Sequence, residues 1–223
     1  MTERRPVTPR EACALAIQHM ARGNAAEAER TLETVLRAAP DDPLATHQLG
    51  LLKVQDGRTE DGLELLRRSI ALAPQEARFH TNLGFVFRLL GRPSEAELAY
   101  RRALDLAPDT PSGYFDLALT LQLQQRLAEA EAAYRRAVEL DPSHTEAWAN
   151  LGTVLQLQRS FTAAYEAYLK ALELTPGDAE IHNNIGSVLK CLDRSEDAEA
   201  AFRRAIELKP DYANAQKNLG DLL

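Results

Sequence analysis

Residues Thr145–Asp178 read TEAWANLGTVLQLQRSFTAAYEAYLKALELTPGD, and this stretch decides the fold of the chain. Apolar residues recur at helical spacing over Thr145–Gln158 and again over Phe161–Leu174, with a short polar break between the two segments. Pro176 follows the second segment, and proline ends a helix because it lacks the backbone N–H that the helix needs. The stretch therefore predicts a helix–turn–helix unit.

The same unit recurs every 34 residues along the chain. A small residue marks it at Ala16, Gly50, Gly84, Ala118, Gly152, Gly186 and Gly220. A proline marks it at Pro40, Pro74, Pro108, Pro142, Pro176 and Pro210, which takes six of the eleven prolines. A fixed period of this length indicates a repeat architecture. One hairpin cannot bury both of its faces, whereas stacked neighbours can, so the sequence predicts an all-α solenoid.

Small residues within the unit predict where its two helices approach each other. Gly152 has no side chain and Ala164 has only a methyl group, while Tyr168 fills the space that remains. The second copy has Gly62 and Ser69 where alanine is usual, and we expect looser packing there. A turn glycine is present at Gly23, Gly57 and Gly91 but is replaced by Gln125, Arg159 and Asp193. The later hairpins must therefore turn without glycine.

The repeat closely resembles the tetratricopeptide repeat (TPR). Its W-x-x-L-G signature stands here as Trp148, Leu151 and Gly152, followed by an alanine, an aromatic residue and the terminal proline. The resemblance covers about residues 9–223. It implies a right-handed superhelical solenoid of six full repeats plus one extra helix. It also implies that the first helix of each repeat lines a concave face and the second helix a convex one.

The repeat period predicts the domain boundaries. Residues 1–8 form an N-terminal arm. The six repeats occupy residues 9–42, 43–76, 77–110, 111–144, 145–178 and 179–212. Residues 213–223 form a half repeat or a C-terminal capping helix.

Composition limits the class of protein. The net charge of −7 argues against nucleic acid as a partner, because nucleic acid attracts basic surfaces. No apolar run is long enough to span a membrane, and the N-terminus does not resemble a secretory signal. Cys13 and Cys191 lie five repeats apart, so we expect free thiols in a reducing compartment and predict a cytoplasmic protein.

Arginine pairs recur on the second helices, which raises the question of a basic stripe. They stand at Arg67-Arg68, Arg101-Arg102, Arg135-Arg136 and Arg203-Arg204. Glutamates lie four residues before Arg101, Arg135 and Arg203, a spacing that favours ion pairs along a helix. We therefore predict a solvated, self-paired face and no nucleic-acid site.

One column of the first helices is rich in carboxamides. The sixth position of successive repeats holds Gln48, Asn82, Asp116, Asn150, Asn184 and Asn218. Amides at a constant rise can hold the backbone of an extended peptide, since each offers two donors and an acceptor. Such an asparagine ladder resembles the repeat region of the O-linked N-acetylglucosamine transferase. In the alternative, the amides cap or pack between adjacent helices.

An apolar strip runs beside this ladder. It consists of Leu51, Phe85, Phe115 and Leu119. An apolar patch rimmed by polar groups is a common mark of a partner site. Burial between repeats is the alternative interpretation for Phe85 and Phe115.

The sequence gives no support for catalysis. It has no glycine-rich phosphate loop, no Gly-x-Ser-x-Gly and no H-E-x-x-H motif. Its five histidines are scattered without metal-ligand spacing, and His80 and His182 fall at the place of Trp148, where packing explains them. We expect no cofactor and no metal.

The sequence therefore predicts a non-enzymatic scaffold that binds an extended peptide segment of a protein partner. The alternative is a substrate-recruiting region of a glycosyltransferase-type or other transferase whose catalytic domain is not in this chain. The identity of the partner stays open, and so does assembly into a homo-oligomer.

Overall fold

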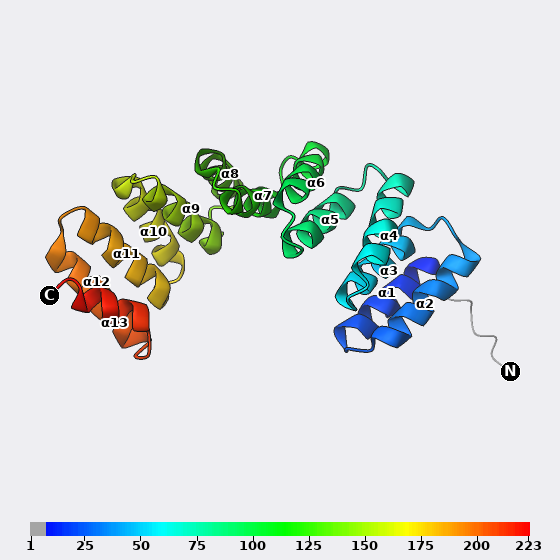
Figure 1. Ribbon diagram of the computed structural model, residues 1–223, viewed down its shortest axis with the longest axis horizontal. Coiled ribbons are helices and arrows are strands. Elements are labelled where there is room, and N and C mark those ends of the chain that lie inside the picture. Colours follow the sequence, from blue (N-terminus) through cyan, green and yellow to red (C-terminus); the bar gives the residue numbers. More distant parts are fainter. Residues whose placement is uncertain (1–7) are drawn as a thin grey trace. The chain divides into compact units, whose positions relative to one another are not determined.

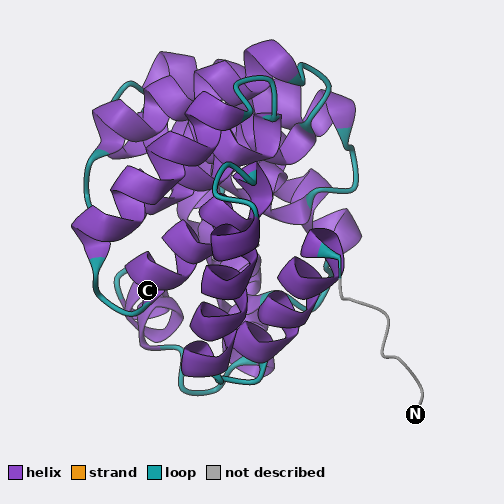
Figure 2. Cartoon of the chain, turned by 90° about the vertical axis from the view of Figure 1, so that its right-hand side faces the viewer, coloured by secondary structure: helices purple, strands orange, loops and turns teal. Residues whose placement is uncertain are grey.

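The computed structural model describes residues 8–223, so most of the predicted N-terminal arm lies outside the described residues. Within residues 8–223 the chain forms thirteen helices and no strand (Figures 1 and 2). The helices are α1 (Pro9–Ala21), α2 (Ala25–Ala38), α3 (Pro43–Gln55), α4 (Thr59–Leu72), α5 (Ala77–Leu89), α6 (Pro93–Leu106), α7 (Pro111–Leu123), α8 (Leu127–Leu140), α9 (Thr145–Leu157), α10 (Phe161–Leu174), α11 (Ala179–Cys191), α12 (Ser195–Leu208) and α13 (Ala213–Gly220). Consecutive helices pack as hairpins, α1 with α2, α3 with α4 and so on to α11 with α12.

The hairpins form two compact units. The N-terminal unit is Met1–Pro108 and the C-terminal unit is Asp109–Leu223. Within each unit, the second helix of one repeat packs on the first helix of the next, as α2 does on α3 and α8 on α9. This is the stacking that the repeat period predicts.

Each hairpin turns through a residue in the left-handed conformation. In the N-terminal unit this residue is glycine, at Gly23, Gly57 and Gly91. In the C-terminal unit Gln125, Arg159 and Asp193 adopt the same conformation, with φ of 60°, 62° and 58°. The later hairpins thus keep the backbone geometry without glycine, although a Cβ makes that geometry less favourable.

Missing side chains set the distance between the helices of a hairpin. A Cβ added at Gly152 would lie 2.7 Å from the ring of Tyr168, and one at Gly186 would lie 2.6 Å from the ring of Phe202. Both rings are fully buried. The glycine therefore provides the space that the aromatic ring of the second helix occupies.

The expectation of looser packing in the second repeat is wrong. A Cβ at Gly62 would lie 2.7 Å from the carbonyl oxygen of Gly50 and 2.5 Å from a methyl carbon of Val54. Two glycines facing each other let α3 and α4 approach through their backbones. Ser69 is fully buried, and its hydroxyl donates a hydrogen bond of 2.7 Å to the carbonyl of Leu66.

The Trp148 place has a polar function besides packing. The indole Nε1 of Trp148 donates to the carbonyl of Pro142 over 3.0 Å. The same bond to the proline carbonyl is made by His80 (3.2 Å), His182 (3.1 Å) and Gln216 (2.7 Å). Four ring or amide N–H groups thus satisfy a carbonyl that the helix end leaves without a partner. The predicted structural role of His80 and His182 is confirmed.

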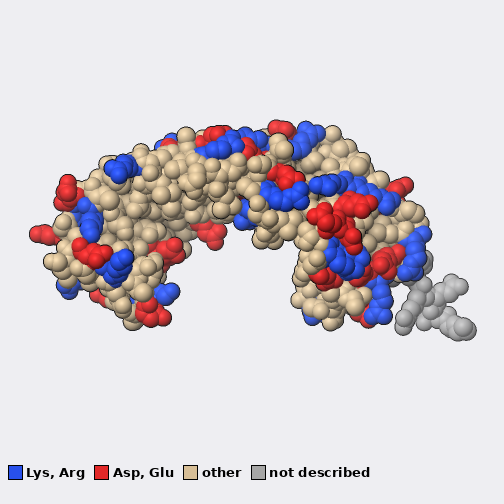
Figure 3. Space-filling view, in the orientation of Figure 1, with Lys and Arg blue, Asp and Glu red and all other residues tan. Residues whose placement is uncertain are grey.

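Charged groups pair along the second helices, as predicted. Arg101 pairs with Glu97, Arg135 with Glu131 and Arg203 with Glu199. On the visible face, both signs of charge are interspersed (Figure 3). A partly buried cluster joins the first two repeats, where Glu29 bonds Lys53 over 2.5 Å and Arg58 over 2.7 Å. The bonds to Arg58 and Lys53 lower the pKa of Glu29 to about 2.

Replacing Arg159 by glycine should stabilise the C-terminal unit by about 1 kcal/mol, because glycine removes the cost of the left-handed conformation. Urea unfolding followed by fluorescence measures this, because Trp148 is the single tryptophan and lies in that unit. Gly57→Ala is the reverse control in the N-terminal unit and is followed by circular dichroism: nothing lies within 4 Å of the added Cβ, so any loss of stability comes from φ alone. A destabilised Arg159→Gly variant would contradict this account of the turn.

Replacing Gly152 by alanine should destabilise the same unit by about 1–3 kcal/mol, since the methyl group meets the buried Tyr168 ring. The matched control is Gly220→Ala at the equivalent position of α13, where nothing lies within 4 Å of the added Cβ. There alanine should be neutral or slightly stabilising, because it favours helix. Equal effects at both positions would show that glycine is not required by the ring. The midpoints of urea unfolding are compared for both variants.

Candidate functional site

The candidate site is the face formed by the first helices of successive repeats. Neighbouring first helices touch, α1 with α3 in the N-terminal unit and α9 with α11 and α11 with α13 in the C-terminal unit. The sixth and ninth residues of a repeat lie one turn apart on this face, because side chains three residues apart are neighbours on a helix. Each unit presents its own part of the face.

The N-terminal unit presents an apolar column at the ninth position. Phe85 is 44% exposed and Leu51 is half-buried, as a ligand-binding strip requires. Ile17 stands at the equivalent place of α1 and is 45% exposed, although the sequence analysis did not include it. The 34-residue register alone could have found it, since Ile17, Leu51 and Phe85 are evenly spaced. Arg88 lies over the Phe85 ring at 5.3 Å from its centroid.

The ladder residues of the N-terminal unit are engaged or buried. Gln48 is only 9% exposed. The Asn82 side-chain nitrogen lies 2.9 Å from Nε2 of His47, which belongs to the preceding repeat. On the other side of the ring, Nδ1 of His47 lies 3.2 Å from the hydroxyl of Ser69. Asn82 therefore joins two repeats, as the alternative interpretation of the column holds.

The protonation of His47 follows from this network. Ser69 already donates its only hydroxyl proton to the Leu66 carbonyl, so it accepts from His47 Nδ1–H. His47 Nε2 is then left to accept from Asn82, which makes the ring neutral. The ring is fully buried and stacked on Phe79 with centroids 4.1 Å apart. Burial, helped by the charge of Arg78, lowers the pKa of His47 to about 4.

In the C-terminal unit the apolar strip is partly packed away. Phe115 is half-buried, and its ring lies edge-on to Tyr134 at 5.9 Å and against His144 at 4.7 Å. Leu119 and the ladder residue Asp116 are half-buried as well. Phe115 thus packs within its own repeat, against α8 and the residue that caps α9, and not between two repeats.

Three amides form a relay at the end of this unit. The side chain of Asn218 donates to Oδ1 of Asn183 over 2.9 Å, and Nδ2 of Asn183 donates to Oδ1 of Asn184 over 3.3 Å. Asn183 is buried, while Asn184 and Asn218 are half-buried. Asn184 keeps its two N–H donors free of this relay. Asn150 is half-buried, and within residues 8–223 its side chain forms no hydrogen bond.

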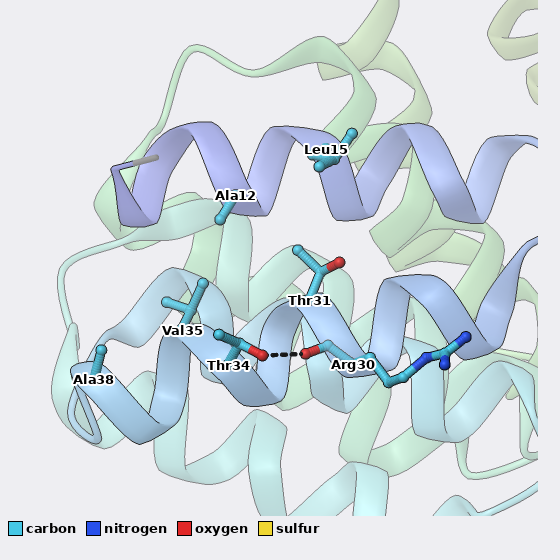
Figure 4. Close-up of a pocket in the computed structure, with 7 residues that line it drawn as sticks. All are labelled: Ala12, Leu15, Arg30, Thr31, Thr34, Val35 and Ala38. Atoms are coloured by element: carbon cyan, nitrogen blue, oxygen red, sulfur yellow. Dashed lines mark hydrogen bonds between the residues drawn. The ribbon is translucent and has the colours of Figure 1, made fainter. Parts of the chain in front are cut away.

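Apart from this face, a hollow of about 440 Å³ lies between α1 and α2 (Figure 4). Ala12, Leu15, Val35 and Ala38 line it with apolar surface. Leu15 is 42% exposed there, whereas the leucines at its place in the next four repeats are buried. Three of them, Leu49, Leu83 and Leu151, belong to first helices on which the preceding second helix packs, so the hollow is the uncovered end face of the repeat stack within the described residues.

The sequence belongs to a known family of repeats. Family models described as tetratricopeptide repeat match residues 47–111, 115–179 and 186–223, which is more than half of the chain. Two further models of the same description match residues 12–34 and 167–200. The chain is a member of the tetratricopeptide repeat family, a class of repeat scaffolds for protein interaction. No curated protein sequence matches it significantly.

Solved structures share the fold. YrrB, described as a TPR protein with an unusual peptide-binding site, is 21% identical with a TM-score of 0.74, over 83% of this chain and 96% of its own. PilF of Pseudomonas aeruginosa is 18% identical with a TM-score of 0.80, over 96% and 97% of the two chains. MamA is 21% identical with a TM-score of 0.70, over 74% and 96%. The predicted all-α repeat solenoid is confirmed.

Three further features of the described residues concern metal binding, membrane crossing and disulfide bonds. Among residues 8–223, no three His, Cys, Asp or Glu side chains gather as metal ligands would. No described helix is both long and apolar enough to cross a bilayer. Cys13 and Cys191 are both free, and burial raises the pKa of Cys13 to about 11.

The buried His47 should make the N-terminal unit sensitive to acid. Its pKa in the folded chain is about 4, below the ordinary 6.5, so its stabilisation is complete above pH 6.5 and is lost as the pH falls towards 4. Between pH 6.5 and 4.5 the loss should reach roughly 2 kcal/mol. Urea unfolding followed by circular dichroism measures it.

The control for this prediction is His47→Gln, which keeps a polar side chain but does not titrate. The variant should have a lower stability at pH 7 and a flatter dependence on pH between 6.5 and 4.5 than the parent. Identical slopes for the two proteins would show that His47 is not the group responsible.

Proposed function

We propose that this TPR protein binds an extended peptide segment of a protein partner on the face of its first helices. The carrying observation is that this face keeps exposed apolar groups beside amide groups that the repeats do not use for their own packing. Ile17, Leu51 and Phe85 supply the apolar column of the N-terminal unit. Asn150 and Asn184 supply amide groups in the C-terminal unit.

The asparagines divide into two groups under this proposal. Asn82 and Asn218 use their N–H groups to join neighbouring repeats, so their main contribution is to hold the first helices in register. Asn150 and the N–H groups of Asn184 remain to bond the carbonyls of an extended segment, which cannot satisfy its own backbone. Of the predicted ladder, we therefore propose Asn150 and Asn184 of the C-terminal unit as the main peptide-binding residues.

Protein binding without catalysis fits the rest of the chain. The family is a scaffold class, and function in such a fold depends on its surface and not on the fold itself. YrrB is described by its peptide-binding site, which supports the same use of this fold here. The free cysteines fit the reducing cytoplasm in which we place the protein.

The double variant Asn150→Ala, Asn184→Ala tests the proposal. Peptides selected from a random displayed library on the wild-type protein serve as probes, and titration calorimetry measures their affinity. Loss of two to four hydrogen bonds of about 1 kcal/mol each should weaken binding at least tenfold. Helicity and unfolding midpoint should change little, because neither side chain joins two first helices.

The matched control is Asn82→Ala. It removes the bond to His47, so it should lower the unfolding midpoint of the N-terminal unit more than it lowers peptide affinity. Affinity that survives the double variant unchanged for every selected peptide would refute the role of Asn150 and Asn184.

A further inference from the structure

The second helices of the N-terminal unit border a groove that the proposed function does not use. It measures about 410 Å³ and lies between α4 and α6, with α5 as its floor. Leu83 and Phe87 of α5 give the floor an apolar surface, and Ile70 of α4 adds an apolar side chain to one wall. Leu98 of α6 stands at the rim and is 70% exposed. We call this feature the α4–α6 groove.

A histidine lines the groove at the place where the fifth repeat has a tryptophan. His80 lines it, and the equivalent residue of the fifth repeat is Trp148. Both side chains donate to the carbonyl of the proline six residues before them, so they are held in the same way. An imidazole is smaller than an indole and leaves the space unfilled. A tryptophan at this place, as in the fifth repeat, would extend further into the groove.

Two arginines give the groove a positive rim. Arg67 forms no hydrogen bond or ion pair within the described residues, since Leu63 stands where other repeats have the pairing glutamate. The bond from Arg92 is the main cause that lowers the pKa of Glu95, which lies on the same groove, and the charge of Arg67 helps to lower it. Arg102 has a weak pair with Asp105 at 3.9 Å, and both side chains are largely exposed. Glu95 also lines the groove, but Arg92 holds its carboxylate in a bidentate pair. The rim is thus positive on a chain whose net charge is −7.

We propose that the α4–α6 groove docks an amphipathic α-helix of a partner protein, with an apolar stripe flanked by acidic residues. A helix fits because it satisfies its own backbone hydrogen bonds, and an apolar floor offers none. Leucines at successive turns occupy the floor beside Leu98. Carboxylates on the flanks bond the guanidinium groups of Arg67 and Arg102, a charge complementarity that selects acidic partners.

Two labelled helical peptides of about 18 residues, or five turns, test this inference. They share one leucine stripe and differ only in having glutamate or lysine on both flanks. Fluorescence anisotropy measures their binding to the full chain. The acidic peptide should bind at least tenfold more tightly than the basic one, and its affinity should fall as salt is added.

Three variants locate the binding. His80→Trp keeps the bond to Pro74 and fills the groove, so it should weaken the acidic peptide at least tenfold. The double variant Arg67→Glu, Arg102→Glu should do the same and improve binding of the basic peptide. The matched control Arg203→Glu, Arg204→Glu reverses an arginine pair of α12 and should leave affinity unchanged. Circular dichroism confirms that each variant is folded.

Equal affinity for the two peptides, or unchanged affinity in His80→Trp, would overturn the inference. So would binding of oleate, tested by calorimetry, in a protein that binds neither peptide, since the occupant would then be a fatty acid. The Asn150→Ala, Asn184→Ala variant should bind the acidic peptide normally. Failure of the groove and failure of the first-helix face are therefore distinguishable.

Discussion

The structure depends on the close approach of the two helices within each hairpin. Where Gly152 or Gly186 faces the ring of Tyr168 or Phe202, the missing Cβ is what admits the ring. In the second repeat the close approach comes from Gly50 and Gly62, which bring the backbones of α3 and α4 together. Because this contact is made inside the hairpin, the outer side of each first helix is left free for neighbours and ligands.

Stacking and recognition compete for the same polar side chains. Bonds from Asn82 to His47 and from Asn218 to Asn183 join first helices of adjacent repeats, and an N–H used in this way is not offered to a ligand. The buried His47 network makes the N-terminal unit dependent on a neutral imidazole. Asn150 has no such neighbour within the described residues, since the preceding repeat offers it Phe115 at the place of His47. An apolar neighbour therefore leaves the Asn150 amide unused within the described residues.

Small departures from the repeat pattern create the individual surface of this chain. His80 and Trp148 make the same bond to a proline carbonyl but differ in volume, and the smaller His80 lines the α4–α6 groove. With Leu63 in the place of a glutamate, Arg67 lacks the ion pair that Arg101 and Arg135 form along their helices. The Trp148 repeat is the best example of the family, whereas the candidate docking groove lies where the sequence deviates from it.

The sequence alone determined the repeat, the helix–turn–helix unit and the pairing of arginines with glutamates along the second helices. These depend on residues a few positions apart, or on a period that side-chain chemistry repeats without change. Tertiary structure alone decided that Gly62 tightens its hairpin, that Asn82 bonds His47 across a repeat boundary, and that Ile17 stays exposed beside Leu51 and Phe85. Each of these depends on which side chain from another helix occupies the adjoining space. The repeat pattern in the sequence does not show which side chain that is.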